Sequence, residues 1–243
     1  MSKKNNEKEK KLKPKSTFGK IWYFIWEDNS LLSWIVNIIL AFVLIKFIVY
    51  PVIGFVLGTG FPVVAVISGS MEHKAVHPCI DSDCSIRDTS TYRICDEYFD
   101  EKPKTNFEFF WNSCGDFYEN LGIVKEEFKN FHFKNGFNTG DIIVIRGIKP
   151  ENIEIGNVIV FAASKDYPII HRVVDIDFKD GVYYYTTKGD HNPEIDPILD
   201  TNIHQDNVIG KAFFKIPYLG WIKIGFVNFL EYIGLFKLVN FIN

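Results

Sequence analysis

The sequence predicts a mainly β, antiparallel and partly barrel-like domain, preceded by a membrane-spanning helix and interrupted by a helical or irregular insert. One apolar run near the N-terminus is long enough to cross a bilayer. The C-terminal half contains short runs of β-branched and aromatic residues separated by turn residues. All four cysteines fall in one 36-residue window between these regions. With 243 residues, the chain can bury the core of one domain of roughly 150 to 200 residues.

Residues 1–20 contain eight lysines and two glutamates, without apolar periodicity. This composition predicts a disordered, basic cytoplasmic tail. The whole chain has a net charge of −3, which excludes the globally basic surface of a nucleic-acid-binding protein. We therefore expect no nucleic-acid partner.

Residues 21–51 are predicted to anchor the chain in a lipid bilayer. The stretch 31–50 supplies the roughly 20 residues that cross the hydrocarbon core, and its one charge, Lys46, lies where it can reach the interface. Basic residues before the span predict a cytoplasmic N-terminus and a main domain on the outer side. A cleaved signal peptide is the alternative, but the run is too long and no small-x-small site follows closely. Pro51, Pro62 and the three glycines in 52–61 argue against a continuing helix.

Residues 72–139 differ in composition and are interpreted as an insert, with a helical stretch around 107–133. Its cysteines predict disulfides if the segment lies outside the cytoplasm. Zinc is the alternative, although the spacing C-x4-C-x10-C-x18-C lacks tight C-x2-C pairs. The four residues are Cys79, Cys84, Cys95 and Cys114. The insert could cover a cleft, bind a partner or decorate the domain.

Residues 52–71 and 140–224 are assigned to the β-rich domain. The predicted strands are 62–67, 141–145, 158–161, 169–176, 182–187 and 207–216. Residues 225–243 are apolar again and are interpreted as a membrane-spanning or interfacial segment, although Glu231 would cost about 2.5 kcal/mol or more inside a bilayer.

Three groups of residues could perform nucleophilic catalysis. Ser68 and Ser70 end an apolar strand at a spacing of two, so that both hydroxyls lie on one side of an extended chain. His171 interrupts an aliphatic strand, which suits a rigidly oriented base. Asp190 and Asp196 lie in a later loop and could orient an imidazole. Taken separately, each also fits a structural reading: a Ser-Gly-Ser turn, a half-buried histidine and an acidic turn.

Taken in this order, four short motifs of the sequence, which we call boxes, resemble the signature of type I signal peptidases, peptidase family S26. The resemblance is to the archaeal and endoplasmic-reticulum branch, which has histidine where the bacterial branch has a catalytic lysine. It covers the anchor, 62–71 and 140 to about 224. The boxes are Ser68-Gly-Ser-Met-Glu72, Gly140-Asp141, Ile170-His-Arg-Val173 and Lys188-Gly-Asp-His-Asn192 with Asp196.

The resemblance implies Ser70 as acylating nucleophile, His171 as general base, Asp196 as orienting acid and Asp190 as a second important carboxylate. Ser68 would contribute its hydroxyl to an oxyanion hole completed by the Ser70 backbone N–H. Neither a metal nor a cofactor is implied.

The implied function is removal of signal peptides from secreted preproteins, with cleavage after small residues at positions −1 and −3. The implied partners are preprotein signal peptides, the lipid bilayer and the protein translocation machinery. The implied location is the cell membrane or the endoplasmic-reticulum membrane, with the catalytic domain on the outer or lumenal side.

The chain departs from the family pattern where His73 takes a usual proline position, where the insert intervenes and where His191 replaces a usual asparagine. The main alternative is a catalytically silent membrane subunit that acts as a binding or assembly module. A third reading, a Ser-Lys dyad through Lys188, leaves His171 unused.

Overall fold

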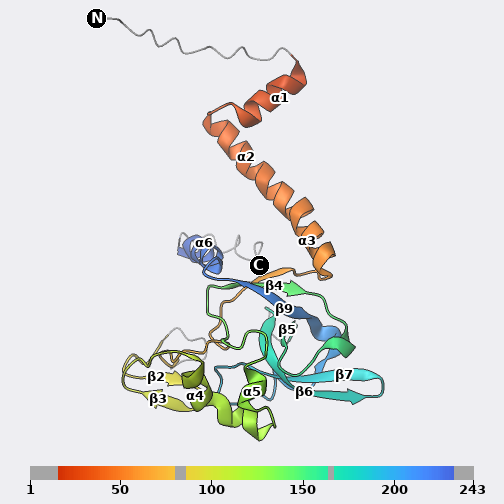
Figure 1. Ribbon diagram of the computed structural model, residues 1–243. Helices are drawn as coiled ribbons and strands as arrows, with labels where there is room; N and C mark the ends of the chain where they lie inside the picture. The colour runs from red at the N-terminus through yellow and green to blue at the C-terminus, as the bar shows by residue number, and fades with distance from the viewer. Residues whose placement is uncertain (1–15, 80–85, 164–166, 233–243) are drawn as a thin grey trace, which may run out of the picture. The chain divides into compact units, whose positions relative to one another are not determined.

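The computed structural model describes residues 16–79, 86–163 and 167–232 and divides the chain into two units, residues 1–53 and 54–243 (Figure 1). The described part of the first unit, residues 16–53, is mostly helical. The second contains the β-sheet, the insert and a C-terminal helix.

The described part of the first unit begins with two capped helices. Helix α1 (Thr17–Trp26) begins after Ser16, whose side chain accepts from the Gly19 N–H. Helix α2 (Leu31–Leu44) begins after Ser30, which caps it in the same way. Because α1 starts at Thr17, the last residues of the predicted tail are helical. Residues 1–15 lie outside the described part of the chain.

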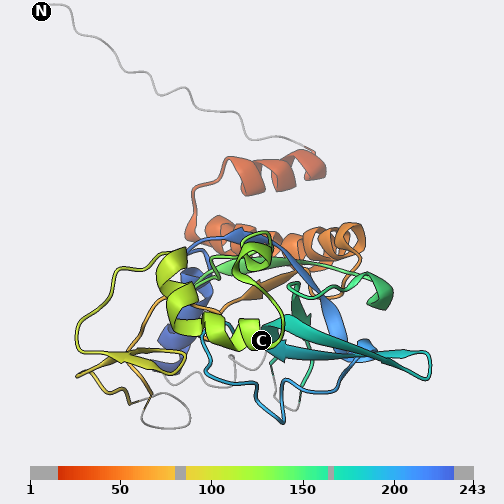
Figure 2. The same ribbon diagram turned by 60° about the horizontal axis from the view of Figure 1, so that its bottom comes forward.

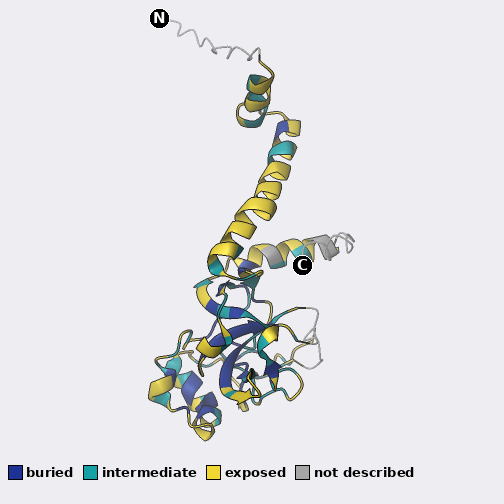
Figure 3. Cartoon of the chain, turned by 90° about the vertical axis from the view of Figure 1, so that its right-hand side faces the viewer, coloured by how far each residue is buried: buried dark blue, intermediate teal, exposed yellow. Residues whose placement is uncertain are grey.

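The apolar helix continues through a π-helical turn, Ile45–Val49, into α3 (Tyr50–Leu57). The resulting helix, Leu31–Leu57, is the one candidate membrane span within the described residues, and its surface is mostly exposed (Figure 3). The expectation that the helix ends near Pro51 is wrong. A π turn one residue before the proline can accommodate its missing N–H. The helix ends instead at Leu57 and is followed by Gly58, whose φ of 66° suits glycine.

A seven-stranded antiparallel sheet forms the body of the second unit, in the order β1-β4-β9-β5-β6-β7-β8. Its strands are β1 (Val63–Ala65), β4 (Ile142–Arg146), β5 (Val158–Phe161), β6 (Ile169–Lys179), β7 (Val182–Lys188), β8 (Ile203–His204) and β9 (Val208–Ile216). The antiparallel fold class is therefore confirmed. The two-residue strand β8 was missed, because it is too short to show alternation.

The sheet curls into a half-barrel because several strand pairs shift register. Shifts occur at Val144/Ile145, at Val160/Phe161 and between Val173 and Asp175, and each extra residue bends its strand. Buried aliphatic and aromatic side chains form two separate clusters on the sheet, and the consecutive β5 residues Val158 and Ile159 belong to different clusters. The two clusters include Val66, Ile143, Val158, Ile159, Phe161, Val173, Tyr185 and Ala212.

The insert has its own core and a disulfide. It contains β2 (Tyr92–Ile94), β3 (Glu97–Phe99), α4 (Phe107–Asn120) and α5 (Lys125–Phe128). In Figures 1 and 2 the yellow β2-β3 hairpin lies beside the yellow-green α4. Buried aromatic residues on the two helices fill this core, namely Phe110, Trp111, Tyr118 and Phe128.

Disulfide bonding in the insert is confirmed, because Cys95 in the β2-β3 turn is bonded to Cys114 on α4. Cys79 is also disulfide-bonded, and Cys84 lies outside the described residues. Within the described part of the chain, no cluster of three or more His, Cys, Asp or Glu residues could hold a metal ion.

Two short 3-10 helices, Pro150–Asn152 and Gln205–Asn207, connect strands of the sheet. The last described helix is α6 (Gly220–Tyr232). Its start is tied to the turn before β4, because the Gly220 N–H donates to the Gly140 carbonyl. The remainder of the apolar segment predicted at 225–243, residues 233–243, lies outside the described part.

Candidate active site

Three side chains from distant parts of the second unit form one hydrogen-bonded line. Ser70 Oγ lies 3.0 Å from His171 Nε2, and His171 Nδ1 lies 2.6 Å from Asp200 Oδ1. Ser70 follows β1, His171 is on β6, and Asp200 precedes β8. The structure therefore brings together the predicted alcohol and imidazole.

Ser70 lies in a turn that begins where β1 leaves the sheet. The Val66 N–H donates to the Asp141 carbonyl, and the Glu72 N–H donates to the Gly69 carbonyl. Ser70 is half-buried, whereas Ser68 is exposed. The turn thus presents the hydroxyl of Ser70 at the surface while the preceding residues remain part of the sheet.

Ser68 lies next to the other predicted oxyanion-hole donor, the Ser70 backbone N–H. The Ser70 backbone N–H donates to Ser68 Oγ at 3.2 Å. The two predicted donors are therefore adjacent to each other and to the Ser70 hydroxyl. Because the Ser68 oxygen accepts this bond, its own hydroxyl hydrogen can be directed outward.

Gly189 fits closely against the Ser70–His171 pair. A Cβ at this position would lie 2.8 Å from the Ser70 carbonyl oxygen and 2.9 Å from His171 Nε2. Any side chain would displace one of the two groups. The loop after β7 therefore approaches the pair as bare backbone.

Asp200, and not the predicted Asp196, contacts the imidazole. The Asp200 carboxylate is fully buried, and its Oδ1 also accepts from Thr187 Oγ1 at 2.6 Å. Asp196 instead accepts from the Ile198 and Leu199 N–H groups. Its side chain is used to stabilise its own turn, which explains why it does not reach His171.

The second predicted carboxylate, Asp190, belongs to a separate buried group that we call the Asp190 cluster (Asp190, Arg172, His73 and Tyr118). Arg172 Nε and Nη2 donate to the two oxygens of Asp190 at 2.9 and 2.6 Å. His73 Nε2 and the Tyr118 hydroxyl each lie 2.8 Å from one of these oxygens. Asp190 therefore bonds to the neighbour of His171 on β6, whereas Asp200 bonds to His171 itself.

Charge neutralisation explains how Asp190 is buried in ionised form. Burial acts to raise the pKa of its carboxyl group, but the adjacent Arg172 guanidinium and the hydrogen bond from His73 outweigh it and hold that pKa well below its usual range. Arg172 also donates to the carbonyls of His132, Phe133 and Gly156. All five guanidinium N–H groups can thus be satisfied inside the protein.

Comparison with known proteins agrees with the sequence boxes. The chain is 32% identical over 94 residues to the signal peptidase complex catalytic subunit SEC11C of Homo sapiens, which is 36% of this chain and 49% of that protein. It is 30% identical over 114 residues to the signal peptidase complex catalytic subunit sec11 of Dictyostelium discoideum, 44% of this chain and 63% of that protein. It is 34% identical over 70 residues to signal peptidase I W of Bacillus subtilis (strain 168), 28% of this chain and 37% of that protein.

These relatives and the sequence motifs support a relationship between the chain and the S26 signal peptidase family. It spans about half the length of the SEC11C proteins that it matches. No family model matches the chain.

Lys188 is the basic residue that a Ser-Lys arrangement would need, but its side chain makes other contacts. Its ammonium donates to the Gly189 carbonyl at 3.1 Å and lies over the Phe117 and Tyr118 rings. Burial lowers the pKa of Lys188 to about 8. Among the described residues, the nitrogen that contacts Ser70 Oγ belongs to His171.

Sequence reasoning missed Asp200 and the two insert residues that bond to Asp190. Asp200 lies in Ile-Leu-Asp-Thr-Asn, which resembles an ordinary polar turn. His73 was noted only as a departure from a family pattern, and Tyr118 is one of 11 tyrosines. No local signal distinguishes these residues, because their partners are far away in the sequence.

Proposed function

We propose that this chain is a membrane-anchored serine endopeptidase that removes signal peptides from preproteins. The proposal depends above all on the continuous line from Ser70 through His171 to Asp200, with distances of 3.0 and 2.6 Å. Both distances are hydrogen-bond lengths. The first joins a nucleophile to its base, and the second joins the base to an orienting acid.

In the proposed reaction, His171 Nε2 accepts the proton of Ser70 as Ser70 Oγ attacks the scissile carbonyl. The Ser68 hydroxyl donates to the oxyanion of the tetrahedral intermediate, and the Ser70 N–H donates to it in place of its resting bond to Ser68 Oγ. His171 then returns the proton to the leaving amine, and the peptide bond breaks. A water molecule attacks the Ser70 ester with His171 again acting as base, which releases the carboxylate product and the free hydroxyl.

Asp200 would hold the Nδ1–H of His171 and stabilise the imidazolium that forms during attack. Its burial makes the interaction strong, and the Thr187 hydroxyl fixes its orientation. Asp200 thus takes the role that the sequence resemblance assigned to Asp196.

The proposed substrates are signal peptides with small residues at −1 and −3, presented at a membrane surface. The apolar helix Leu31–Leu57 supports anchoring in the cell membrane or the endoplasmic-reticulum membrane, with the catalytic domain on the outer or lumenal side. The translocation machinery is a proposed partner, because preproteins emerge from it.

The test is cleavage of a labelled preprotein by the full-length protein purified in detergent or reconstituted in vesicles. We expect a single cut after the small residue at −1. Ser70→Ala and His171→Ala should each reduce kcat by roughly 10⁴-fold or more while the domain remains folded by circular dichroism. Intact preprotein after incubation with the wild-type protein would favour a silent membrane subunit instead.

A further inference from the structure

The loop that carries Ser70 and the loop after β7 are joined by several contacts. The His191 N–H donates to the Ser70 carbonyl at 2.8 Å, and His191 Nδ1 lies 3.1 Å from the Glu72 carbonyl. The Asp190 N–H points to Met71 Sδ at 3.4 Å. A displacement of residues 189–191 would therefore move the nucleophile.

The Asp190 side chain anchors this second loop inside the protein. An ionised carboxylate offers about four acceptor positions. Arg172 on β6 fills two of them, and His73 and Tyr118 fill the other two. Both of the latter residues come from the insert, so the catalytic sheet satisfies only half of this buried anion by itself.

His73 is a neutral hydrogen-bond donor with a fixed orientation. Burial lowers the pKa of its imidazole, and its ring stacks on Phe110 with 3.5 Å between centroids. Within the described part of the chain, its buried Nδ1 has no hydrogen-bond partner. The proton therefore resides on Nε2 and is donated to Asp190.

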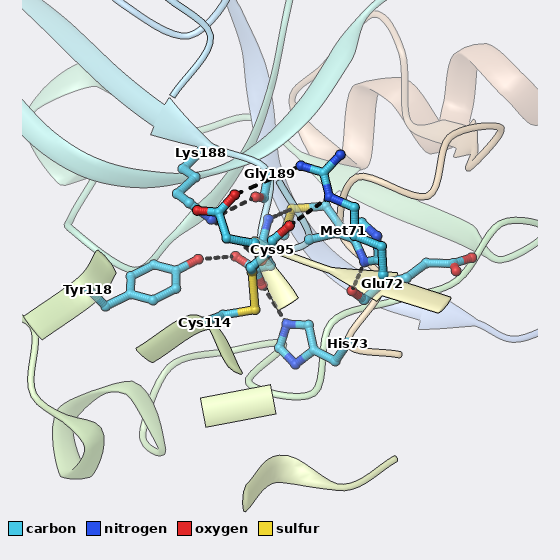
Figure 4. The surroundings of a disulfide bond; sticks show 12 residues. Met71, Glu72, His73, Cys95, Cys114, Tyr118, Lys188 and Gly189 are labelled. Carbon is cyan, nitrogen blue, oxygen red and sulfur yellow. Dashed lines mark hydrogen bonds and ion pairs between the residues drawn. A yellow bond between two sulfur atoms is a disulfide. The ribbon is translucent and has the colours of Figure 1, made fainter. Parts of the chain in front are cut away.

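Tyr118 is held by the disulfide-bonded part of the insert (Figure 4). It lies one helical turn after Cys114 on α4, and its side chain is fully buried. Cys114 is bonded to Cys95, whose backbone N–H donates to the His191 carbonyl at 3.0 Å. The insert thus holds the loop at two points, through the Asp190 carboxylate and through the His191 backbone.

We infer that His73 and Tyr118 are positioning residues for the Ser70–His171 pair and act through Asp190. Their hydrogen bonds keep Asp190 in place, and Asp190 keeps Gly189 and His191 against the nucleophile. The insert is then part of the catalytic apparatus and not a decoration. This inference rests on the proposed peptidase function.

The first test removes a single oxygen atom. In Tyr118→Phe the ring remains packed while one bond to Asp190 is lost. We expect kcat on a labelled preprotein to fall roughly tenfold with KM within about twofold, because small displacements of catalytic groups mainly affect the chemical step. Tyr98→Phe is the matched control, because Tyr98 is in the same insert but 60% exposed. Its kcat should match that of the wild type.

The second test separates hydrogen bonding from packing at position 73. His73→Leu removes the donor, and His73→Gln retains an amide N–H near the same place. We expect His73→Leu to lower kcat roughly tenfold or more and His73→Gln to restore most of the loss. Both assays are run below the unfolding temperature of each variant.

Wild-type kcat in both Tyr118→Phe and His73→Leu would overturn the inference. It would also be overturned if His73→Gln were as slow as His73→Leu, because packing alone would then explain the loss. An active wild type with unaffected variants contradicts only this inference. An inactive wild type overturns the proposed function and the inference together.

Discussion

Asp200 and Asp190 are both fully buried, but their surroundings differ in one respect. The line from Asp200 ends at Ser70, a half-buried hydroxyl that a substrate can reach. The Asp190 cluster has no described member that reaches the surface in this way, and its carboxylate already has four donors. An open hydrogen-bonded line can transfer a proton to a substrate, whereas a closed cluster can only hold its neighbours in place.

The largest expected difference concerns the two candidate orienting acids. Asp200→Asn should reduce kcat by roughly 10³- to 10⁴-fold, because the amide cannot stabilise the imidazolium or fix its tautomer. Asp196→Asn should remain within about tenfold of the wild type, because Asp196 caps a turn and does not contact His171. Preprotein cleavage by the two variants measures this difference. Equal losses would restore Asp196 to the role that the sequence suggested.

Asp190→Asn should act mainly on stability. Loss of a buried charge opposite Arg172 should lower the free energy of unfolding by about 3 to 5 kcal/mol, as measured by denaturant titration. We also expect a lower kcat in the folded fraction, because displacement of the loop after β7 would move Ser70. An unchanged free energy of unfolding would contradict the description of the cluster as a stabilising ion pair.

The same variant should alter the dependence of stability on pH. The folded-state pKa of Asp190 lies well below that of the unfolded chain, about 3.9. Its contribution is therefore fully present above pH of about 4 and is lost as the pH falls toward the folded-state pKa. The wild type should lose stability on acidification more steeply than Asp190→Asn. Parallel curves would mean that Asp190 is not ionised in the folded protein.

Removal of the Cys95–Cys114 disulfide should destabilise the insert by about 3 kcal/mol, because the two residues are 19 positions apart and the bond restricts the unfolded chain. The Cys95→Ser/Cys114→Ser double variant isolates this bond from the one that involves Cys79. If the insert positions the loop, the variant should also show lower kcat at temperatures where it remains folded. Unchanged stability would show that packing alone holds α4.

The smallest expected effect is at Lys188. Lys188→Met should retain preprotein cleavage within about tenfold, since Lys188 is not the base in the proposed reaction. The folded-state pKa of about 8 lies below the usual 10.4, so wild-type stability should rise between these pH values as the buried amine is neutralised. The variant should lack that rise. Loss of cleavage comparable to that of His171→Ala would instead support a Ser-Lys dyad.

Most of the sheet could be predicted from the sequence because its strands are locally distinctive. The runs at 158–161 and 169–176 are rich in β-branched residues and bounded by turn residues, and they form β5 and most of β6. The apolar helix was also predictable, but its end was not. Pro51 normally disfavours a helix interior, and only the π turn before it allows the helix to reach Leu57.

The insert was less predictable. Its helical stretch and disulfide bonding followed from composition and cysteine clustering, but the β2-β3 hairpin did not. Tyr92–Ile94 and Glu97–Phe99 are too short to show a pattern, and the turn between them contains Cys95 with a φ of 50°. Its cross-link to α4 is a long-range contact that local sequence does not report.

The sequence by itself determined the parts of this protein that depend on local composition: a membrane-length helix, an antiparallel sheet, and the serine and histidine within recognisable boxes. Only the tertiary structure decided which carboxylate contacts His171 and what the insert does. The reason is physical. A hydrogen-bond partner is selected by distance and direction, and both depend on how the turn 196–200 and helix α4 fold back on the sheet.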